Sequence, residues 1–260
     1  MKKIYNKNVA LVTGASEGIG FEIAKTLSLN GLKVLMVSRD FKKLKRSIKL
    51  IKDLGGDPEF LCGDVSKKTI PIEAIKKASN LGSLKILINN TGGPKTGNIL
   101  SLKEKDWEQA IQNNLMSVIR FSKLAIPIMK KNNFGRIISI SSTVVLEPTP
   151  NMVLSATSRA GISSLTKTIA NQFAKNNITA NVIMPGGVMT KRLKNLVKQR
   201  AKKENKSVIS IMKLLEKTIP AERFASPEEI ANLVLFLVSK KASYINGVNL
   251  NIDGSLIKGY

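Results

Sequence analysis

The sequence contains no histidine and only one cysteine, Cys62, in a chain of 260 residues. Without histidine, the chain excludes a Ser-His-Asp relay, a histidine general base and the commonest zinc ligand. A single cysteine also excludes an internal disulfide and a metal site built from several cysteines. We therefore expect no metal site, and we expect Cys62 to fill space in the core.

Aromatic and acidic residues are both scarce. Phe, Trp and Tyr make up 5% of the chain, and 18 acidic residues face 42 lysines and arginines, which gives a formal charge of +24. Such a charge attracts polyanions, so nucleic acid has to be considered as a partner. However, few aromatic rings are present to stack on bases, and the lysines are scattered through nearly every expected helix. This pattern favours a solvated basic surface over a nucleic-acid site.

Long hydrophobic runs are also missing. No stretch approaches the ~20 consecutive apolar residues of a membrane span, and no N-terminal signal peptide is visible. We therefore expect a cytoplasmic protein without a membrane partner. The apolar fraction of 43% and the chain length are sufficient for one sizeable core.

What the chain does contain is a regular alternation of short apolar runs and amphipathic stretches. Such alternation predicts a single α/β domain over residues 1–260, a Rossmann-type, doubly wound parallel sheet of about seven strands with helices on both faces. The expected strands are 8–13, 33–38, 58–62, 85–90, 135–140, 178–183 and 247–251, and the expected helices lie near 18–30, 40–54, 67–80, 101–131, 151–176, 191–217 and 227–239.

Residues 189–220 interrupt this alternation with a long, highly charged stretch. An insertion at the carboxyl edge of a parallel sheet lies where ligands bind. We therefore expect residues 189–220 to form a substrate lid. The alternative is a solvated pair of surface helices.

The clearest motif is the glycine-rich turn at residues 13–20, Thr-Gly-Ala-Ser-Glu-Gly-Ile-Gly, between the first expected strand and helix. Such a turn lets backbone N–H groups approach a phosphate at the positive end of the helix. This arrangement predicts a bound nucleotide pyrophosphate. The expected contacts are Gly14, Ser16, Gly18, Ile19 and Gly20.

The second strand ends in Ser38 and Arg39, about 20 residues beyond the glycines, where dinucleotide folds meet the adenosine ribose. A guanidinium there suits the 2′-phosphate of NADP, so we expect NADP, with NAD as the alternative. Arg39 could also be an exposed arginine at the start of a helix. Glu17, inside the glycine turn, would repel a nearby phosphate if it points inward.

Two further loops follow strands. After the third strand, Asp64 and Val65 are placed to contact adenine, although Asp64 could simply cap the next helix. After the fourth strand, Asn90 and Gly92 lie in the run Asn-Asn-Thr-Gly-Gly-Pro at 89–94. Its small residues would let the backbone pass close to a cofactor, or could form an ordinary turn.

These motifs together resemble the short-chain dehydrogenase/reductase family, and within it the 3-oxoacyl-acyl-carrier-protein reductases. The resemblance implies hydride transfer between NAD(P)H and a carbonyl or alcohol, and a homotetramer or homodimer. It also implies cofactor contacts at Pro185, Gly186, Val188 and Thr190. The matching elements are the glycine turn, Asp64-Val65, 89–93, Trp107, Asn114, the 136–142 strand, 181–190, 227–231, 244–247 and 253–254.

The catalytic set that the resemblance implies is altered. Asn114 and Ser142 match the family, but Ser155 stands at the position of the tyrosine in YxxxK and Arg159 at that of the lysine. A tyrosine pKa near 10 can be lowered toward neutrality, whereas a serine hydroxyl is far less acidic. Arg159 can hold ribose hydroxyls, but it cannot relay a proton by losing one. Asn114 could keep a structural role alone.

Three functions follow, in decreasing order of preference. The first is an NADP-dependent reductase of a small-molecule carbonyl or alcohol, in which Ser142 or water donates the proton. The second is a cofactor-binding sensor or subunit partner without turnover. The third is a polyanion binder on the same fold. The basic run at 191–203 adds a hypothesis of an anionic or carrier-linked substrate attracted by long-range steering.

Overall fold

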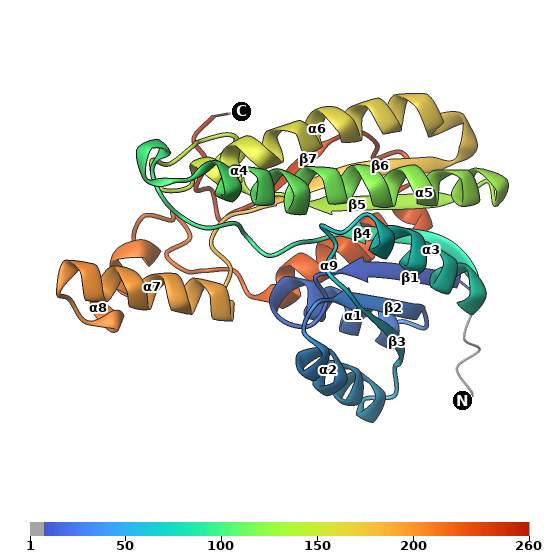
Figure 1. Ribbon diagram of the computed structural model, residues 1–260, viewed down its shortest axis with the longest axis horizontal. Coiled ribbons are helices and arrows are strands. Elements are labelled where there is room, and N and C mark those ends of the chain that lie inside the picture. Colours follow the sequence, from blue (N-terminus) through green and yellow to red (C-terminus); the bar gives the residue numbers. More distant parts are fainter. Residues whose placement is uncertain (1–7, 260) are drawn as a thin grey trace.

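The computed structural model describes residues 8–259, and its centre is one seven-stranded sheet in the order β3-β2-β1-β4-β5-β6-β7 (Figure 1). Every neighbouring pair of strands is parallel. The predicted single Rossmann-type sheet is therefore confirmed. The strands are β1 (Asn8–Thr13), β2 (Lys33–Ser38), β3 (Asp57–Cys62), β4 (Ser83–Asn89), β5 (Gly135–Ile140), β6 (Ile178–Pro185) and β7 (Asn249–Ile252).

The helices cover both faces of the sheet. Along β1, Ala10 and Val12 pack into one core with α1, α2 and α9, whereas Val9 and Leu11 pack into a second core with α3, α5 and α6. Because side chains alternate across a strand and both faces are covered, an internal strand reads as a continuous apolar run. These helices are α1 (Gly18–Leu29), α2 (Phe41–Asp53), α3 (Thr69–Leu81), α5 (Ser117–Lys131), α6 (Val153–Phe173) and α9 (Pro227–Leu237).

The helix expected at 101–131 is not continuous. It consists of the 3-10 turn η1 (Ile99–Ser101), α4 (Glu104–Ile111), a π-helical turn η2 (Gln112–Met116) and α5. In the wide turn, the Ser117 hydroxyl donates to the carbonyl of Asn113. The apolar periodicity continues through this turn, so the sequence pattern alone could not reveal it.

The stretch expected as one helix at 191–217 is two helices, α7 (Lys191–Glu204) and α8 (Val208–Glu216). Asn205 ends α7 in the left-handed region at φ 51°, a common helix termination. Ser207 then caps α8 by accepting from the N–H of Ser210 at 3.0 Å. Both helices lie beyond the end of the sheet toward which the strand arrows point (Figure 1).

Three short 3-10 turns complete the elements, namely η3 (Thr143–Val145), η4 (Ala174–Asn176) and η5 (Lys240–Ala242). The prediction for Cys62 is wrong, because this residue ends β3 at the edge of the sheet and is exposed. Among residues 8–259, no helix is long and apolar enough to cross a membrane. Residues 1–7 and 260 of the predicted domain lie outside the described residues.

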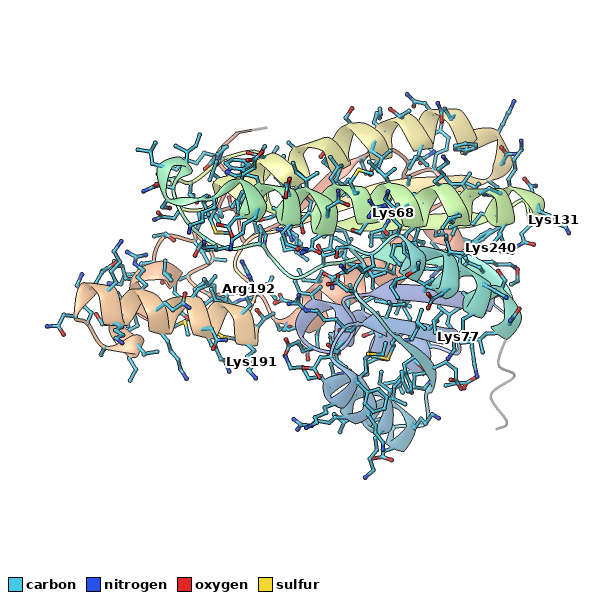
Figure 2. All side chains as sticks on the ribbon, viewed as in Figure 1. Lys68, Lys77, Lys131, Lys191, Arg192 and Lys240 are labelled. Carbon is cyan, nitrogen blue, oxygen red and sulfur yellow. The ribbon has the colours of Figure 1, made fainter. Side chains whose placement is uncertain are left out.

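The basic side chains are spread over many elements. Lys68 and Lys77 belong to the start and body of α3, Lys131 ends α5 and Lys240 begins η5, whereas Lys191 and Arg192 lie together at the start of α7 (Figure 2). The local concentration at α7 borders the carboxyl ends of the strands. This edge is where a ligand of a doubly wound sheet binds.

Candidate functional site

The turn between β1 and α1 is shaped by its glycines. Gly14 and Gly18 have φ values of 59° and 62°, in the left-handed region that favours glycine. A Cβ on Gly20 would lie 2.3 Å from the carbonyl oxygen of Gly14. The side chain of Glu17, the N-cap residue, does not cap α1, so the first-turn N–H groups are available to an anion.

Asn90 ties this turn to the loop after β4. Its Nδ2 donates to the carbonyl oxygens of Thr13 at 3.3 Å and of Gly14 at 3.2 Å. Its main-chain N–H donates to the Thr13 hydroxyl at 2.9 Å. The strand order reverses between β1 and β4, so Asn90 spans the crevice in which doubly wound folds bind ligands.

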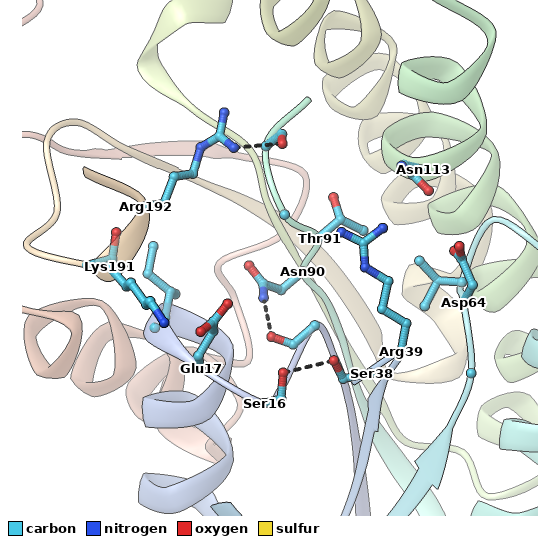
Figure 3. Close-up of a pocket in the computed structure, with 18 residues that line it drawn as sticks. Ser16, Glu17, Ser38, Arg39, Asp64, Asn90, Thr91, Asn113, Lys191 and Arg192 are labelled. Atoms are coloured by element: carbon cyan, nitrogen blue, oxygen red, sulfur yellow. Dashed lines mark hydrogen bonds between the residues drawn. The ribbon is translucent and has the colours of Figure 1, made fainter. Parts of the chain in front are cut away.

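A cavity of about 290 Å³ opens between the glycine turn and the loops that follow the neighbouring strands (Figure 3). Most of the predicted cofactor residues line it: Gly14, Ser16, Gly18, Ile19, Ser38, Arg39, Asp64, Val65, Asn90, Gly92 and Thr190. Five predicted residues do not line it: Gly20, Arg159, Pro185, Gly186 and Val188. The lining also includes Glu17, Gly63, Thr91, Gly93, Asn113, Lys191 and Arg192.

Ser38 and Arg39 lie at the end of β2 on the rim of this cavity (Figure 3). The hydroxyls of Ser16 and Ser38 are 2.9 Å apart, which joins the glycine turn to β2. The Arg39 carbonyl accepts from the Cys62 thiol at 3.6 Å. Its exposed guanidinium has no ion pair or hydrogen bond within residues 8–259, so it is free to bind a phosphate.

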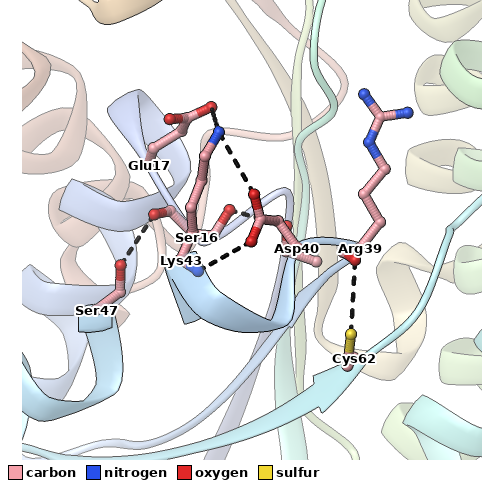
Figure 4. Close-up of polar contacts among 8 residues, drawn as sticks. Ser16, Glu17, Arg39, Asp40, Lys43, Ser47 and Cys62 are labelled. Atoms are coloured by element: carbon pink, nitrogen blue, oxygen red, sulfur yellow. Dashed lines mark hydrogen bonds and ion pairs between the residues drawn. The ribbon is translucent and has the colours of Figure 1, made fainter. Parts of the chain in front are cut away.

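Glu17 lines the same cavity, but its charge is offset. Its Oε1 is 2.9 Å from the ammonium of Lys43, which also lies 3.8 Å from Asp40 (Figure 4). Asp40 caps α2 by accepting from the N–H of Lys43 at 3.0 Å, and this hydrogen bond lowers the pKa of Asp40. The repulsion that Glu17 would exert on a phosphate is therefore reduced by its lysine partner.

Asp64 and Val65 line the cavity beyond β3. Asp64 accepts from the N–H of Ser66 at 3.0 Å. Helix α3 begins at Thr69 with Lys68 as its N-cap, so Asp64 does not cap it. The alternative explanation of Asp64 as a helix cap is excluded, and its side chain lies beside the cavity.

Asn114 is buried in η2 and joins two other elements. Its Oδ1 accepts from the Thr91 hydroxyl at 2.8 Å, and its Nδ2 donates to the Ser158 hydroxyl at 2.8 Å. The amide thus connects the loop after β4 with α6. Both of its polar atoms are used in holding these elements together.

Ser155 and Arg159 lie one turn apart on α6, and both are buried. The Nη1 of Arg159 donates to the Ser155 hydroxyl at 2.7 Å, whereas its buried Nε has no hydrogen-bond partner among the described residues. Burial, followed by repulsion from Arg192, lowers the pKa of Arg159 to about 10. The guanidinium is still charged at neutral pH, so a cation is held in the interior beside a neutral hydroxyl.

Ser142 lies in the loop between β5 and η3, and α6 packs against η3. The Ser142 hydroxyl accepts from the N–H of Val144 at 3.4 Å. No hydrogen bond joins it to Ser155 or Arg159 within the described part of the chain. The structure therefore puts the predicted catalytic residues on adjacent elements, outside the lining of the cavity.

The segment from Pro185 to Thr190 anchors α7. Val188 is buried and pairs with Ala225, while the N–H of Gly186 donates to the Ile252 carbonyl at 3.1 Å. Thr190 caps α7 by accepting from Leu193 at 3.3 Å. Its methyl group would lie 3.4 Å from a Cβ on Gly18. Of the predicted residues here, only Thr190 therefore reaches the cavity.

Arg192, in the first turn of α7, crosses to the loop after β4 (Figure 3). Its Nη1 donates to the Gly93 carbonyl at 2.7 Å and its Nη2 to the Pro94 carbonyl at 2.9 Å. Burial lowers the pKa of Arg192. These bonds hold α7 against the rim of the cavity.

Asn113, Gly63 and the contact of Arg192 with Gly93 belong to the site, but no motif in the sequence indicates them. Asn113 lines the cavity because of the π-helical turn, and no pattern in the sequence signals that turn. The Gly92-Gly93 pair does indicate that another group approaches the backbone closely at this point. In the structure that group is the side chain of Arg192, which fills the space beside Gly93.

Comparisons with known proteins agree with this architecture. The family model described as short chain dehydrogenase matches residues 8–201. A 3-oxoacyl-(acyl-carrier-protein) reductase FabG of Buchnera aphidicola subsp. Schizaphis graminum is 35% identical over 251 residues, covering 96% of this chain and 97% of that protein. The same-named protein of Escherichia coli (strain K12) is 32% identical, covering 97% and 98%.

Among solved structures, YwfH, an NADPH-dependent reductase involved in bacilysin biosynthesis, superposes with a TM-score of 0.92 at 31% identity and covers 98% of this chain and 100% of its own. A variant of actinorhodin polyketide ketoreductase with NADPH gives 0.94 at 26% identity, covering 98% and 100%. The family match, the full-length relatives and the shared sheet lead to one assignment: the chain belongs to the short-chain dehydrogenase/reductase family.

Proposed function

We propose that this protein is an NADP-dependent oxidoreductase that transfers a hydride between NADP(H) and a carbonyl or alcohol substrate. The observation that carries the proposal is the cavity at the β1/β4 crevice. One part of its lining is the N-terminus of α1, which has no side-chain cap, and another is the unpaired guanidinium of Arg39. The similar solved structures that depend on or contain NADPH support the same cofactor.

The residues present fit NADP. The first-turn N–H groups of α1 would hold the pyrophosphate, and Arg39 with Ser38 would hold the 2′-phosphate. Asp64 and Val65 would contact the adenine. When bound, the cofactor supplies the hydride that a carbonyl carbon accepts, and a proton must reach the carbonyl oxygen to complete the alcohol.

The proton source differs from that of a YxxxK enzyme. Ser155 is bound to a cationic guanidinium, which favours the hydroxyl's deprotonated form, yet an alkyl hydroxyl starts far from neutrality. We assign proton donation to Ser142 or a water molecule, with Arg159 supplying positive potential near the developing oxyanion. General acid–base catalysis contributes about 10²–10⁴-fold, so a slow enzyme acting on a reactive carbonyl is expected.

The proposed role of residues 189–220 is a substrate lid. The contact of Arg192 with Gly93 and Pro94 supports it, since α7 meets the loop on the other side of the cavity. The surface-helix alternative describes α8 better, since α8 lies farther from the sheet (Figure 1).

The first test is cofactor binding by fluorescence. NADPH should bind more tightly than NADH, and Arg39→Gln should weaken NADPH binding by about 10-fold or more while leaving NADH unchanged. Arg46→Gln removes the same charge from the exposed face of α2 and serves as the control. If neither nucleotide binds the wild type, the proposal fails.

The second test is turnover of NADPH with ketones, aldehydes and β-ketoacyl substrates. Ser142→Ala should abolish this turnover if Ser142 donates the proton and should leave it measurable if water does. The second candidate function, cofactor binding without turnover, is favoured by the Ser155 and Arg159 pair. It prevails if NADPH binds at micromolar levels and the whole panel is inert.

A further inference from the structure

Arg159 is a buried cation without a buried anion. It is 7% exposed, its Nη1 is bound to a neutral serine, and its Nε has no partner within residues 8–259. No ion pair in the described part of the chain includes it. A buried charge without a counterion is costly to desolvate, and an anionic ligand bound to Arg159 would offset that cost.

The surroundings add positive potential. Ser155 lies in the first turn of α6, whose N-cap residue Met152 makes no side-chain cap and whose first turn contains no acidic residue. The N-terminus of a helix carries about half a positive charge. Arg192 also repels Arg159, and its own guanidinium is bound to carbonyl groups of the backbone, not to a carboxylate.

The free edge of Arg159 has a defined shape. A guanidinium is planar and presents its donors as a fork. Nη1 is bound to Ser155, and Nε is buried without a hydrogen-bond partner among the described residues. A ligand therefore reaches the Nε–Nη2 edge only when the atoms that cover Nε move aside. Two parallel N–H donors match the two oxygens of one carboxylate.

We infer that Ser155, Arg159 and the N-terminus of α6 form an anion subsite that binds a carboxylate group of the substrate. This inference rests on the proposed function and narrows it: the substrate is a keto acid whose carboxylate lies against Arg159. In this arrangement, the positions of the family's proton-relay tyrosine and lysine serve substrate binding. The Ser155 hydroxyl holds Nη1 and thereby orients the free edge.

The experiment measures binding without turnover. Pyruvate and its uncharged amide, pyruvamide, are titrated by calorimetry into the protein saturated with NADP⁺, at constant ionic strength. Pyruvate should bind the wild type, and Arg159→Gln should weaken its binding by about 10-fold or more. Arg159→Lys keeps the positive charge but lacks the planar pair of donors, so its affinity for pyruvate should lie between those of the wild type and Arg159→Gln. Pyruvamide should bind weakly and equally to all three proteins.

Controls separate this inference from the proposed function. Arg46→Gln, with the same loss of net charge on α2, should bind pyruvate like the wild type. NADP⁺ binding and circular dichroism are measured for every variant, so that a misfolded protein is recognised. If NADP⁺ binds but pyruvate binds no more tightly than pyruvamide, or binds Arg159→Gln equally well, the anion subsite is wrong. If NADP⁺ fails to bind the wild type, the proposed function falls instead.

Discussion

The guanidinium of Arg192 occupies the space in which residue 93 would carry a side chain. A Cβ built on Gly93 lies 2.4 Å from the Cζ of Arg192, while Arg192 donates to the Gly93 carbonyl at 2.7 Å. The contact joins α7 to the loop after β4 across the rim of the cavity. The contact therefore depends both on the absence of a side chain at Gly93 and on the length of the Arg192 side chain.

This contact predicts that Gly93→Ala and Arg192→Gln have the same effect. Each should release α7 and raise the NADPH dissociation rate by about fivefold, which corresponds to about 1 kcal/mol for the lost hydrogen bonds. Stopped-flow fluorescence measures the rate. The double variant should match the single ones, because both remove the same contact. Additive effects would show that Gly93 and Arg192 act separately.

A second prediction concerns the stability cost of Arg159. Burial lowers the pKa of Arg159 from its ordinary value, which the unfolded chain retains, to about 10 in the folded protein. Below pH 10 both states are charged and the cost is fully present. As the pH rises above 10 toward the ordinary pKa of arginine, the folded state releases its proton first, so the cost disappears and stability rises.

Arg159→Met lacks this titration. Its free energy of unfolding should equal or exceed that of the wild type at neutral pH. As the pH rises above 10, the free energy of unfolding of the wild type should increase relative to that of Arg159→Met. Urea unfolding of both proteins across the window measures the difference, in which the titration of the many lysines cancels. A wild type that loses stability relative to Arg159→Met on going to higher pH would contradict the assigned direction.

A third prediction tests whether the scaffold kept the geometry of a YxxxK enzyme. Ser155→Tyr with Arg159→Lys should raise the rate of NADPH-dependent reduction of an uncharged ketone by about 10²–10⁴-fold. Ser155 is buried, so thermal unfolding must show that the larger ring is accommodated. The same variant should lose affinity for pyruvate. A stable double variant with no gain in rate would show that the surrounding geometry has changed as well.

A fourth prediction concerns Glu17. Lys43→Gln leaves the carboxylate of Glu17 without its partner at 2.9 Å, and the exposed negative charge then repels the cofactor phosphates. NADPH binding should weaken by a few-fold, more at low than at high salt. Adding Glu17→Gln should restore affinity. If Lys43→Gln weakens binding equally with and without Glu17→Gln, Lys43 acts on the cofactor directly.

The parts of the fold that depend on local pattern were predictable from the sequence. Both faces of the sheet are covered, so internal strands such as β1 are uninterrupted apolar runs, and the loops at their ends could be placed by counting residues. The glycine turn, Ser38, Arg39 and Asp64 line one cavity as a result. Pro185, Gly186 and Val188 lie outside the lining of that cavity, where Val188 pairs with Ala225, and their contact with a cofactor stays a prediction.

The remaining features arise from contacts between distant segments. Cys62 is exposed because β3 is an edge strand, a fact that strand order decides and composition does not. The contact of Arg192 with Gly93 spans 99 residues. The unpartnered Nε of Arg159 is likewise visible only once α6 has been packed.

The π-helical turn η2 also limits how the chain can change in length. It lets Asn113 line the cavity while the next residue, Asn114, binds α6. Because a π-helical turn holds one residue more than an α-helical turn, deleting one residue there would restore a regular helix and leave Phe121 and Ala125 in the core in which they are buried, but it would move Asn113 and Asn114 out of their present positions. A change of length in the segment 112–116 should therefore impair the site more than the packing of α5, and Asn114, whose amide joins two other elements, should not tolerate substitution.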